Sequence, residues 1–189
     1  MTTQRNTAIV TGAASGIGRA MTLGLLGTGI DVTAVDREAP WLDELKGAVA
    51  ASRLSGQLQT LQSDLSDPAS FDRIVAAVLG AAGRIDILVN NAGIGQGSIR
   101  ADQRRKPLRF WDITPAQWGR FVAVNATAPL MLARAVVPHM LRAKQRPVCR
   151  HRSVRRISVA PRRSVLGDKP TRSLPRGFVP LPHTGVRRG

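Results

Sequence analysis

Short runs of apolar residues alternate with segments of helical periodicity along the first three quarters of the chain. The apolar and β-branched runs predict buried strands at residues 7–11, 30–36, 57–63 and 85–90. Apolar positions three and four apart predict helices from about residue 17 and over residues 41–51, 68–79 and 114–140, the last two capped by Asp67 and Thr114. Strands that alternate with helices are typical of a parallel sheet covered on both faces, so the pattern predicts an α/β domain.

This alternation stops near residue 144. Residues 145–189 hold half of the 12 prolines and sustain neither the helical nor the strand period. They also carry twelve lysines and arginines against one acid, Asp168, and so supply most of the net charge of +16. We therefore expect residues 1–144 to form one domain with a C-terminally incomplete sheet, and residues 145–189 to form a basic, irregular and disordered tail.

Composition excludes several classes of protein. The 43% apolar content is enough for a packed core. Cys149 is the only cysteine, which rules out an internal disulfide or a redox pair and favours a cytoplasmic location. No stretch approaches the roughly 20 uncharged apolar residues of a membrane helix, and residues 1–6 are polar, so neither a membrane span nor a leader is expected. The cysteine and the histidines show no metal-ligand spacing, so no metal site is expected.

A glycine-rich turn follows the first predicted strand and reads Thr-Gly-Ala-Ala-Ser-Gly-Ile-Gly over residues 11–18. A sharp turn from a strand into a helix points backbone N–H groups and the positive helix end at one place, where a pyrophosphate fits. Glycines in such a site permit the tight turn, the close approach of backbone to phosphate and the close packing of helix on strand. The candidate phosphate-binding residues are Gly12, Ser15, Gly16, Ile17 and Gly18.

Asp36 ends the second predicted strand, where a carboxylate can accept hydrogen bonds from both hydroxyls of a ribose. The same carboxylate would repel a phosphate on the ribose 2′ oxygen, whereas the neighbouring Arg37 would attract one. The two residues act in opposite directions, and we expect the repulsion from Asp36 to favour NAD over NADP as the cofactor. Capping of a local turn is the alternative role for Asp36.

Four motifs in this order resemble the short-chain dehydrogenase/reductase family. They are Thr-Gly-x-x-x-Gly-x-Gly at residues 11–18, Asp64-Leu65, Asn90-Asn91-Ala92-Gly93 and Val124-Asn125, and the resemblance covers about residues 5–143. It implies a Rossmann-type doubly wound fold, an NAD(P) cofactor, and hydride transfer between the nicotinamide and a small alcohol or carbonyl substrate. It further implies that Asp64 and Leu65 contact the adenine, that Asn91, Ala92 and Gly93 line the adenosine site, and that the chain forms homo-oligomers.

Asn125 lies on an apolar helical stripe, where an amide side chain needs hydrogen-bond partners. Pro129 follows four residues later and lacks the N–H that would bond the carbonyl of Asn125, so this carbonyl is released to hold a water molecule. In the family that the chain resembles, the matching asparagine is catalytic through its main chain. A kinked helix with a structural asparagine is the alternative. The other members of the stripe are Trp118, Phe121, Val122, Leu132 and Val136.

The family supplies its proton donor from a tyrosine in Tyr-x-x-x-Lys, assisted by a serine, and this chain has no tyrosine. The family spacing places Val165 where the phenol should be, and valine transfers no proton. Ser153 and Lys169 fall near the other two positions, but the surrounding pattern is absent and we assign them no catalytic role. We therefore expect hydride transfer to be impaired, with Asn125 as the remaining candidate for the catalytic centre.

The tail leaves several interpretations open. A reading-frame change near residue 145 would explain both the missing tyrosine and the arginine-rich composition, because Val165 to Asp168 read one base later can encode Tyr-Ser-Ala-Thr. A genuine tail would bind polyanions non-specifically, although Phe178 is its sole aromatic residue and specific nucleic-acid recognition is not expected. The chain is then an impaired oxidoreductase, a non-catalytic NAD-binding module, or a polyanion-binding protein on the same scaffold.

Overall fold

A six-stranded sheet forms the centre of the molecule in the computed structural model, which describes residues 5–102, 105–143, 148–151 and 154–157. The strand order is β3-β2-β1-β4-β5-β6. Strands β1 to β5 run parallel, and β6 pairs antiparallel with β5. The strands are β1 (Thr7–Thr11), β2 (Asp31–Asp36), β3 (Leu58–Gln62), β4 (Ile87–Asn90), β5 (Val148–His151) and β6 (Val154–Ile157).

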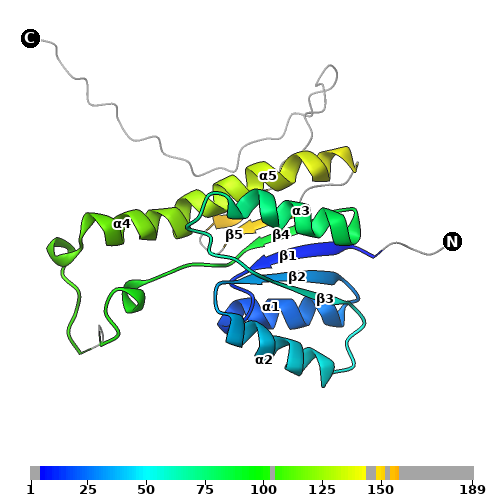
Figure 1. Cartoon of the computed structure of the whole chain (residues 1–189), viewed down its shortest axis with the longest axis horizontal. Coiled ribbons are helices and arrows are strands. Elements are labelled where there is room, and N and C mark those ends of the chain that lie inside the picture. Colours follow the sequence, from blue (N-terminus) through cyan, green and yellow to red (C-terminus); the bar gives the residue numbers. More distant parts are fainter. Residues whose placement is uncertain (1–4, 103–104, 144–147, 152–153, 158–189) are drawn as a thin grey trace, which may run out of the picture.

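Helices cover both faces of this sheet, as the alternating pattern predicts (Figure 1). Helices α1 (Gly16–Gly27) and α2 (Ala39–Ala50) lie on one face, while α3 (Ser70–Ala82) and α5 (Ala128–Arg142) lie on the other. Strand β1 contributes to both cores, because Ile9 packs with α3 and α5 whereas Ala8 and Val10 pack on the side of α1 and α2. All three side chains are fully buried. Burial on both faces explains why β1 is continuously apolar.

Several element boundaries differ from the sequence prediction by one to three residues, and at two of the later starts a carboxylate holds the preceding turn. Strand β4 begins at Ile87, after Asp86, whose buried carboxylate accepts from the backbone N–H of Thr7 at 2.8 Å and pairs with Arg84. Helix α3 begins at Ser70 with Ala69 as its N-cap. Asp67 is therefore not the N-cap; its carboxylate accepts from the Ala69 N–H at 3.0 Å in the turn before the helix.

The long helix after β4 begins as predicted and is interrupted in the middle. Thr114 and Gln117 form a reciprocal capping box in front of α4 (Pro115–Val122). A π-turn, η3 (Ala123–Thr127), then leads into α5, and the N–H of Ala128 donates to the carbonyl of Ala123, five residues back. The interruption lies just before Pro129, the residue that the sequence identifies as a break in the helical ladder.

The apolar stripe of this helix is only partly buried. Leu132 and Val136 are fully buried against the sheet, whereas Trp118 is 57% exposed. In Figure 1, α4 projects beyond the body of the molecule, so the stripe leaves the core at this end. The stripe that the sequence predicts is therefore buried in α5 and open to solvent at Trp118 in α4. The segment before α4 contains two short 3-10 helices, η1 (Gln96–Ser98) and η2 (Phe110–Asp112).

The sheet continues beyond residue 144. Strand β5 pairs with β4 in register, with Ile87 opposite Val148, and β6 adds the next strand. The prediction of irregular structure from residue 145 is therefore wrong for residues 148–151 and 154–157, and β5 covers one edge of β4. Ser153, Val165, Lys169 and residues 158–189 lie outside the described residues.

One helical stretch within the described residues, Pro115–Arg142, is long and apolar enough to cross a membrane by length and composition, with a hydropathy of 1.5. The expectation from the sequence concerned a run of about 20 uncharged apolar residues, and Arg120 and Arg134 interrupt this helical stretch. Leu132, Val136 and Met140 pack in the core, which accounts for the apolar residues of its second half.

Candidate functional site

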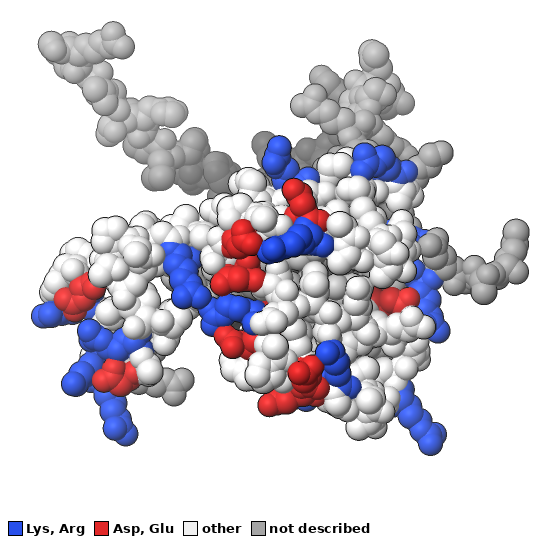
Figure 2. All heavy atoms as spheres, viewed as in Figure 1, with Lys and Arg blue, Asp and Glu red and all other residues white. Residues whose placement is uncertain are grey.

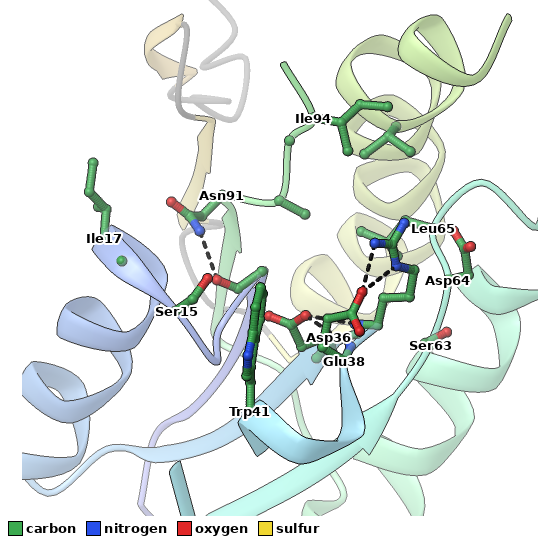
Figure 3. A pocket seen from close by; sticks show the side chains of 17 residues that line it. Ser15, Ile17, Asp36, Glu38, Trp41, Ser63, Asp64, Leu65, Asn91 and Ile94 are labelled. Carbon is green, nitrogen blue, oxygen red and sulfur yellow. Dashed lines mark hydrogen bonds and ion pairs between the residues drawn. The ribbon is translucent and has the colours of Figure 1, made fainter. Parts of the chain in front are cut away.

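A cleft of about 360 Å³ opens at the carboxyl ends of the central strands (Figure 3). Open parallel sheets bind ligands in this place, where the strand order reverses on either side of the first strand. Every predicted cofactor-binding residue except Gly18 lines the cleft. These residues are Gly12, Ser15, Gly16, Ile17, Asp36, Arg37, Asp64, Leu65, Asn91, Ala92 and Gly93.

The turn after β1 requires glycine at two positions that face the cleft. Gly12 has φ +60°, and a Cβ there would lie 2.8 Å from the Cα of Ala92. Gly16 has φ +51° and open space beside it. Ser15, the N-cap of α1, has an extended backbone, and its side chain makes no capping hydrogen bond. The first turn of α1 thus offers backbone N–H groups to an anion, as the sequence predicts.

Gly18 lies behind this turn and not in the cleft. A Cβ on Gly18 would collide with the carbonyl oxygen of Gly12 and with the side-chain nitrogen of Asn91. The same nitrogen donates to the carbonyls of Thr11 and Gly12 at 3.2 and 3.0 Å. Asn91 therefore braces the turn from below, and Gly18 permits helix α1 to approach it closely.

Asp36 is fixed at the end of β2 by three backbone groups. Its carboxylate accepts from the N–H of Ala14 at 3.0 Å, from Arg37 at 2.8 Å and from Glu38 at 3.3 Å. The first of these bonds ties β2 to the glycine turn. The carboxylate is thus held beside the turn, where it can also accept from the hydroxyls of a ribose.

Asp64 follows β3 on another side of the cleft. Burial opposes ionisation of its carboxyl, but hydrogen bonds from the backbone N–H and hydroxyl of Ser66 outweigh it, with help from Arg120 and Arg37, so the pKa lies below its ordinary value. The two Ser66 bonds measure 2.9 and 2.7 Å and reach the same oxygen of Asp64. The other oxygen lies 4.0 Å from the guanidinium of Arg120 on α4.

Asn125 lies in the π-turn, and its side chain holds the segment after β4. Its amide oxygen accepts from the N–H of Ile94 at 3.1 Å, and its amide nitrogen donates to the carbonyls of Ile94 and Phe121, both at 3.0 Å. The side chain is therefore fully occupied in joining two elements. These bonds give the side chain a structural role, and the part of the Asn125 main chain in holding a water molecule stays a prediction.

Several lining residues were not predicted from the sequence. They are Val35, Glu38, Trp41, Ser63, Ile94 and Val124. Glu38 and Ser63 each lie within two residues of a predicted cofactor-binding residue. Their position just after a strand is the sequence feature that could have identified them. Trp41 stands in the first turn of α2 and is 46% exposed. A tryptophan five residues after the end of a strand is a sequence feature that could have indicated a cleft-lining side chain.

Charged residues around the cleft are arranged as pairs of opposite sign. Figure 2 shows acidic and basic side chains intermixed on this face, without a large patch of one sign. The pairs include Arg37 with Glu38 at 2.7 Å and Arg73 with Asp67 at 2.6 Å. Among the described residues no three metal-ligating side chains gather, so the part of the chain that the structure covers offers no metal site.

The arrangement fits an adenine dinucleotide. Backbone donors face the space for a pyrophosphate, a glycine is required where a Cβ would fill the turn, and Asp36 lies beside that turn at the end of β2. Asp64 and Leu65, to which the resemblance assigns the adenine, line the same cleft. No tyrosine exists anywhere in the chain to donate a proton to a carbonyl.

Known proteins are similar to this chain in sequence and in fold. The family model described as short chain dehydrogenase matches residues 6–153. A short chain dehydrogenase of Pseudocercospora fijiensis is 36% identical over 141 residues, which are 75% of this chain and 42% of the relative. A metagenomic short-chain oxidoreductase in complex with NADP is 33% identical with a TM-score of 0.65, over 74% of this chain and 58% of that one.

A third similar protein is L-sorbose reductase from Gluconobacter frateurii, complexed with NADPH and L-sorbose. It is 27% identical with a TM-score of 0.67, over 78% of this chain and 52% of that one. The chain thus spans about half the length of the relatives that it matches. Because the family model matches well over half of the chain, the chain belongs to the short-chain dehydrogenase family.

Proposed function

We propose that the cleft binds an adenine dinucleotide, with the pyrophosphate on the first turn of α1 and the adenosine ribose on Asp36. The observation that carries the proposal is the hydrogen bond from the Ala14 N–H to the Asp36 carboxylate, which brings the ribose acceptor and the phosphate-binding turn into one rigid unit. Backbone donors at a helix N-terminus stabilise a pyrophosphate, and a carboxylate at the end of the second strand accepts from ribose hydroxyls.

NAD is the proposed cofactor in preference to NADP. Asp36 would repel a 2′-phosphate in a partly buried site. The two solved relatives named above carry NADP and NADPH, so the preference rests on the residues of this chain alone.

The reaction class is hydride transfer between the nicotinamide and the carbon of a small alcohol or ketone. The bound dinucleotide would supply the hydride donor or acceptor. This chain would bind and orient the dinucleotide, and the Asn125 main chain would hold a water molecule near the reacting groups. Turnover is impaired because a carbonyl that accepts hydride also needs a proton, and the tyrosine that supplies it in the family is absent.

A non-catalytic dinucleotide-binding module is the second candidate, and the same absence of tyrosine favours it. The two candidates differ in turnover and not in binding. A panel of alcohols with NAD and of ketones with NADH, followed at the absorbance of the reduced nicotinamide, separates them. Slow turnover favours the impaired oxidoreductase, and no turnover favours the binding module.

Binding itself is tested by calorimetric titration of the full chain with NAD and NADP. We expect heat of binding with NAD and a weaker response with NADP. Asp36→Asn should weaken NAD binding by about tenfold, since it removes the charge on the ribose acceptor.

Asp31→Asn is the matched control, because Asp31 begins the same strand at its opposite end and accepts from the Gln57 N–H outside the cleft. It should leave NAD affinity unchanged. Absence of binding by the folded wild-type chain would overturn the proposal.

A further inference from the structure

Arg37 follows Asp36 directly and lines the cleft, where a free guanidinium would attract a phosphate on the ribose 2′ oxygen. Its guanidinium is not free. Nε and Nη2 of Arg37 both donate to the same carboxylate oxygen of Glu38, at 2.9 and 2.7 Å. Figure 3 shows these bonds beside Asp36, at the end of β2. Two N–H groups of the Arg37 guanidinium are therefore already bonded to Glu38.

Glu38 is held in place by the backbone around it. It is the N-cap residue of α2 and has an extended backbone, and its N–H donates to Asp36 at 3.3 Å. The Arg37 N–H donates to the same oxygen of Asp36 at 2.8 Å. The three consecutive residues thus form a compact turn in which the carboxylate of Glu38 and that of Asp36 both lie near the Arg37 guanidinium.

The charges around Arg37 are predominantly negative. The hydrogen bonds that Arg37 donates to Glu38 raise the pKa of Arg37 against the effect of burial, and the charges of Glu38, Asp64 and Asp36 add to this rise. Glu38 thus contacts this guanidinium directly, and the charges of Asp36 and Asp64 also act on it. A phosphate that entered here would meet their combined repulsion, and it would have to displace Glu38 to gain the arginine.

We propose that Glu38 is a specificity-determining residue, which withholds Arg37 from the ribose 2′ position and so makes the cleft reject a 2′-phosphate. This proposal rests on the proposed binding of an adenine dinucleotide. Asp36 accepts from the hydroxyls of an unphosphorylated ribose and repels a 2′-phosphate, and Glu38 decides whether the arginine next to it can offset that repulsion.

The experiment measures the ratio of the NADP and NAD dissociation constants by calorimetry at low ionic strength. Glu38→Gln keeps the size of the side chain but removes its charge, so Arg37 becomes available to the 2′-phosphate. We expect the ratio of the NADP constant to the NAD constant to fall by about tenfold. The fall should shrink as salt is added, because the Arg37 and Glu38 side chains are half exposed, at 49% and 39%.

A double variant tests whether the gain passes through Arg37. In Glu38→Gln combined with Arg37→Gln, the gain in relative NADP affinity should disappear, since no guanidinium remains to meet the phosphate. Asp43→Asn is the matched control for charge. Asp43 pairs with Lys46 at 2.8 Å on the exposed side of α2, outside the cleft, and its loss should leave the ratio unchanged.

The outcomes separate this proposal from the proposed function. If the wild-type chain binds neither nucleotide, dinucleotide binding itself is wrong and the role of Glu38 falls with it. If the wild-type chain binds NAD but Glu38→Gln leaves the ratio unchanged, dinucleotide binding stands and the role of Glu38 is wrong. An equal fall in Asp43→Asn, or a fall that persists in the double variant, would also overturn it, because the effect would then be one of net charge.

Discussion

Helices α4 and α5 belong to one long helical stretch and share an apolar stripe, but they meet different surroundings. Leu132, Val136 and Met140 of α5 are fully buried between α3 and the sheet. None of the residues Pro115–Val122, all of which the structure describes, is buried. The periodicity shows which side chains share a face. Whether that face is covered depends on elements distant in the sequence. These elements cover α5 and leave α4 exposed.

The largest effect should come from the buried half. Leu132→Ala removes a fully buried side chain, and we expect it to lower the free energy of unfolding by about 3–5 kcal/mol, because the cavity cannot collapse against the sheet. Leu130→Ala is the matched substitution two residues earlier, at a side chain that is 64% exposed, and should change stability by less than about 0.5 kcal/mol. Urea denaturation measures both. Equal losses of unfolding free energy in the two variants would show that the exposure of a side chain does not determine its contribution to stability in this helix.

The second largest effect should come from the π-turn that joins α4 and α5. Asn125→Ala leaves the Ile94 backbone N–H and carbonyl without their side-chain partners, and we expect a loss of about 2–3 kcal/mol in unfolding free energy. Asn125→Asp retains the acceptor for the Ile94 N–H but loses both donor bonds, so its loss should also be clear. Thermal unfolding of the two variants measures this, and a wild-type melting temperature for Asn125→Ala would contradict the role of the amide.

The exposed half depends on its own cap. Thr114 accepts from the Gln117 N–H at 3.3 Å, so Thr114→Ala should cost about 0.5–1 kcal/mol. Thr114→Ser keeps a hydroxyl at the same place and should stay close to the wild type. Chemical denaturation followed by circular dichroism measures the difference. A loss as large as that of Leu132→Ala would mean that α4 is packed more tightly than its exposure indicates.

The smallest effect concerns the ion pair between α4 and the sheet. The pKa of Asp64 is lowered in the folded state, by the Ser66 bonds and by Arg120 and Arg37 against the effect of burial. The stability that Asp64 contributes is therefore present above its unfolded pKa of about 4 and lost as pH falls through the lower folded value. In Asp64→Asn, the free energy of unfolding should fall less steeply with decreasing pH below about pH 4. Glu44→Gln, at an exposed position of α2, changes the charge equally and should leave the steepness unchanged.

The parts of the fold that the sequence predicts well are those that local chemistry decides. Strand β1 is recognisable because both of its faces are buried, and α4 begins at Thr114 because the capping box is built from residues three apart. The start of α3 was missed because the Asp67 carboxylate bonds to the turn before the helix. Strands β5 and β6 were missed because the arginine-rich segment lacks a strand pattern, and β5 is defined by its pairing with β4.

The same division holds for the cleft. Gly12, Gly16 and Asp36 were predicted from their spacing along a turn and a strand, and the structure brings them together. Glu38 and Trp41 were not predicted, since the first turn of α2 sets which of its side chains face the cleft. The ion pair between Arg37 and Glu38 joins neighbours in the chain. No periodic pattern in the sequence distinguishes such a pair from two separately solvated side chains.

The π-turn over Ala123–Thr127 also has a consequence for the length of the helix. A turn of this kind contains one residue more than the α-helical turn it replaces, so the extra residue is absorbed within the turn. Deletion of a single residue there would restore an unbroken ladder and leave Leu132 on the core side. Each residue of an α-helix rotates the chain by about 100°, so a deletion within the regular part of α5 would instead turn every later residue away from its present partners. The π-turn is therefore the part of the long helix where the loss of one residue disturbs the packing of α5 least.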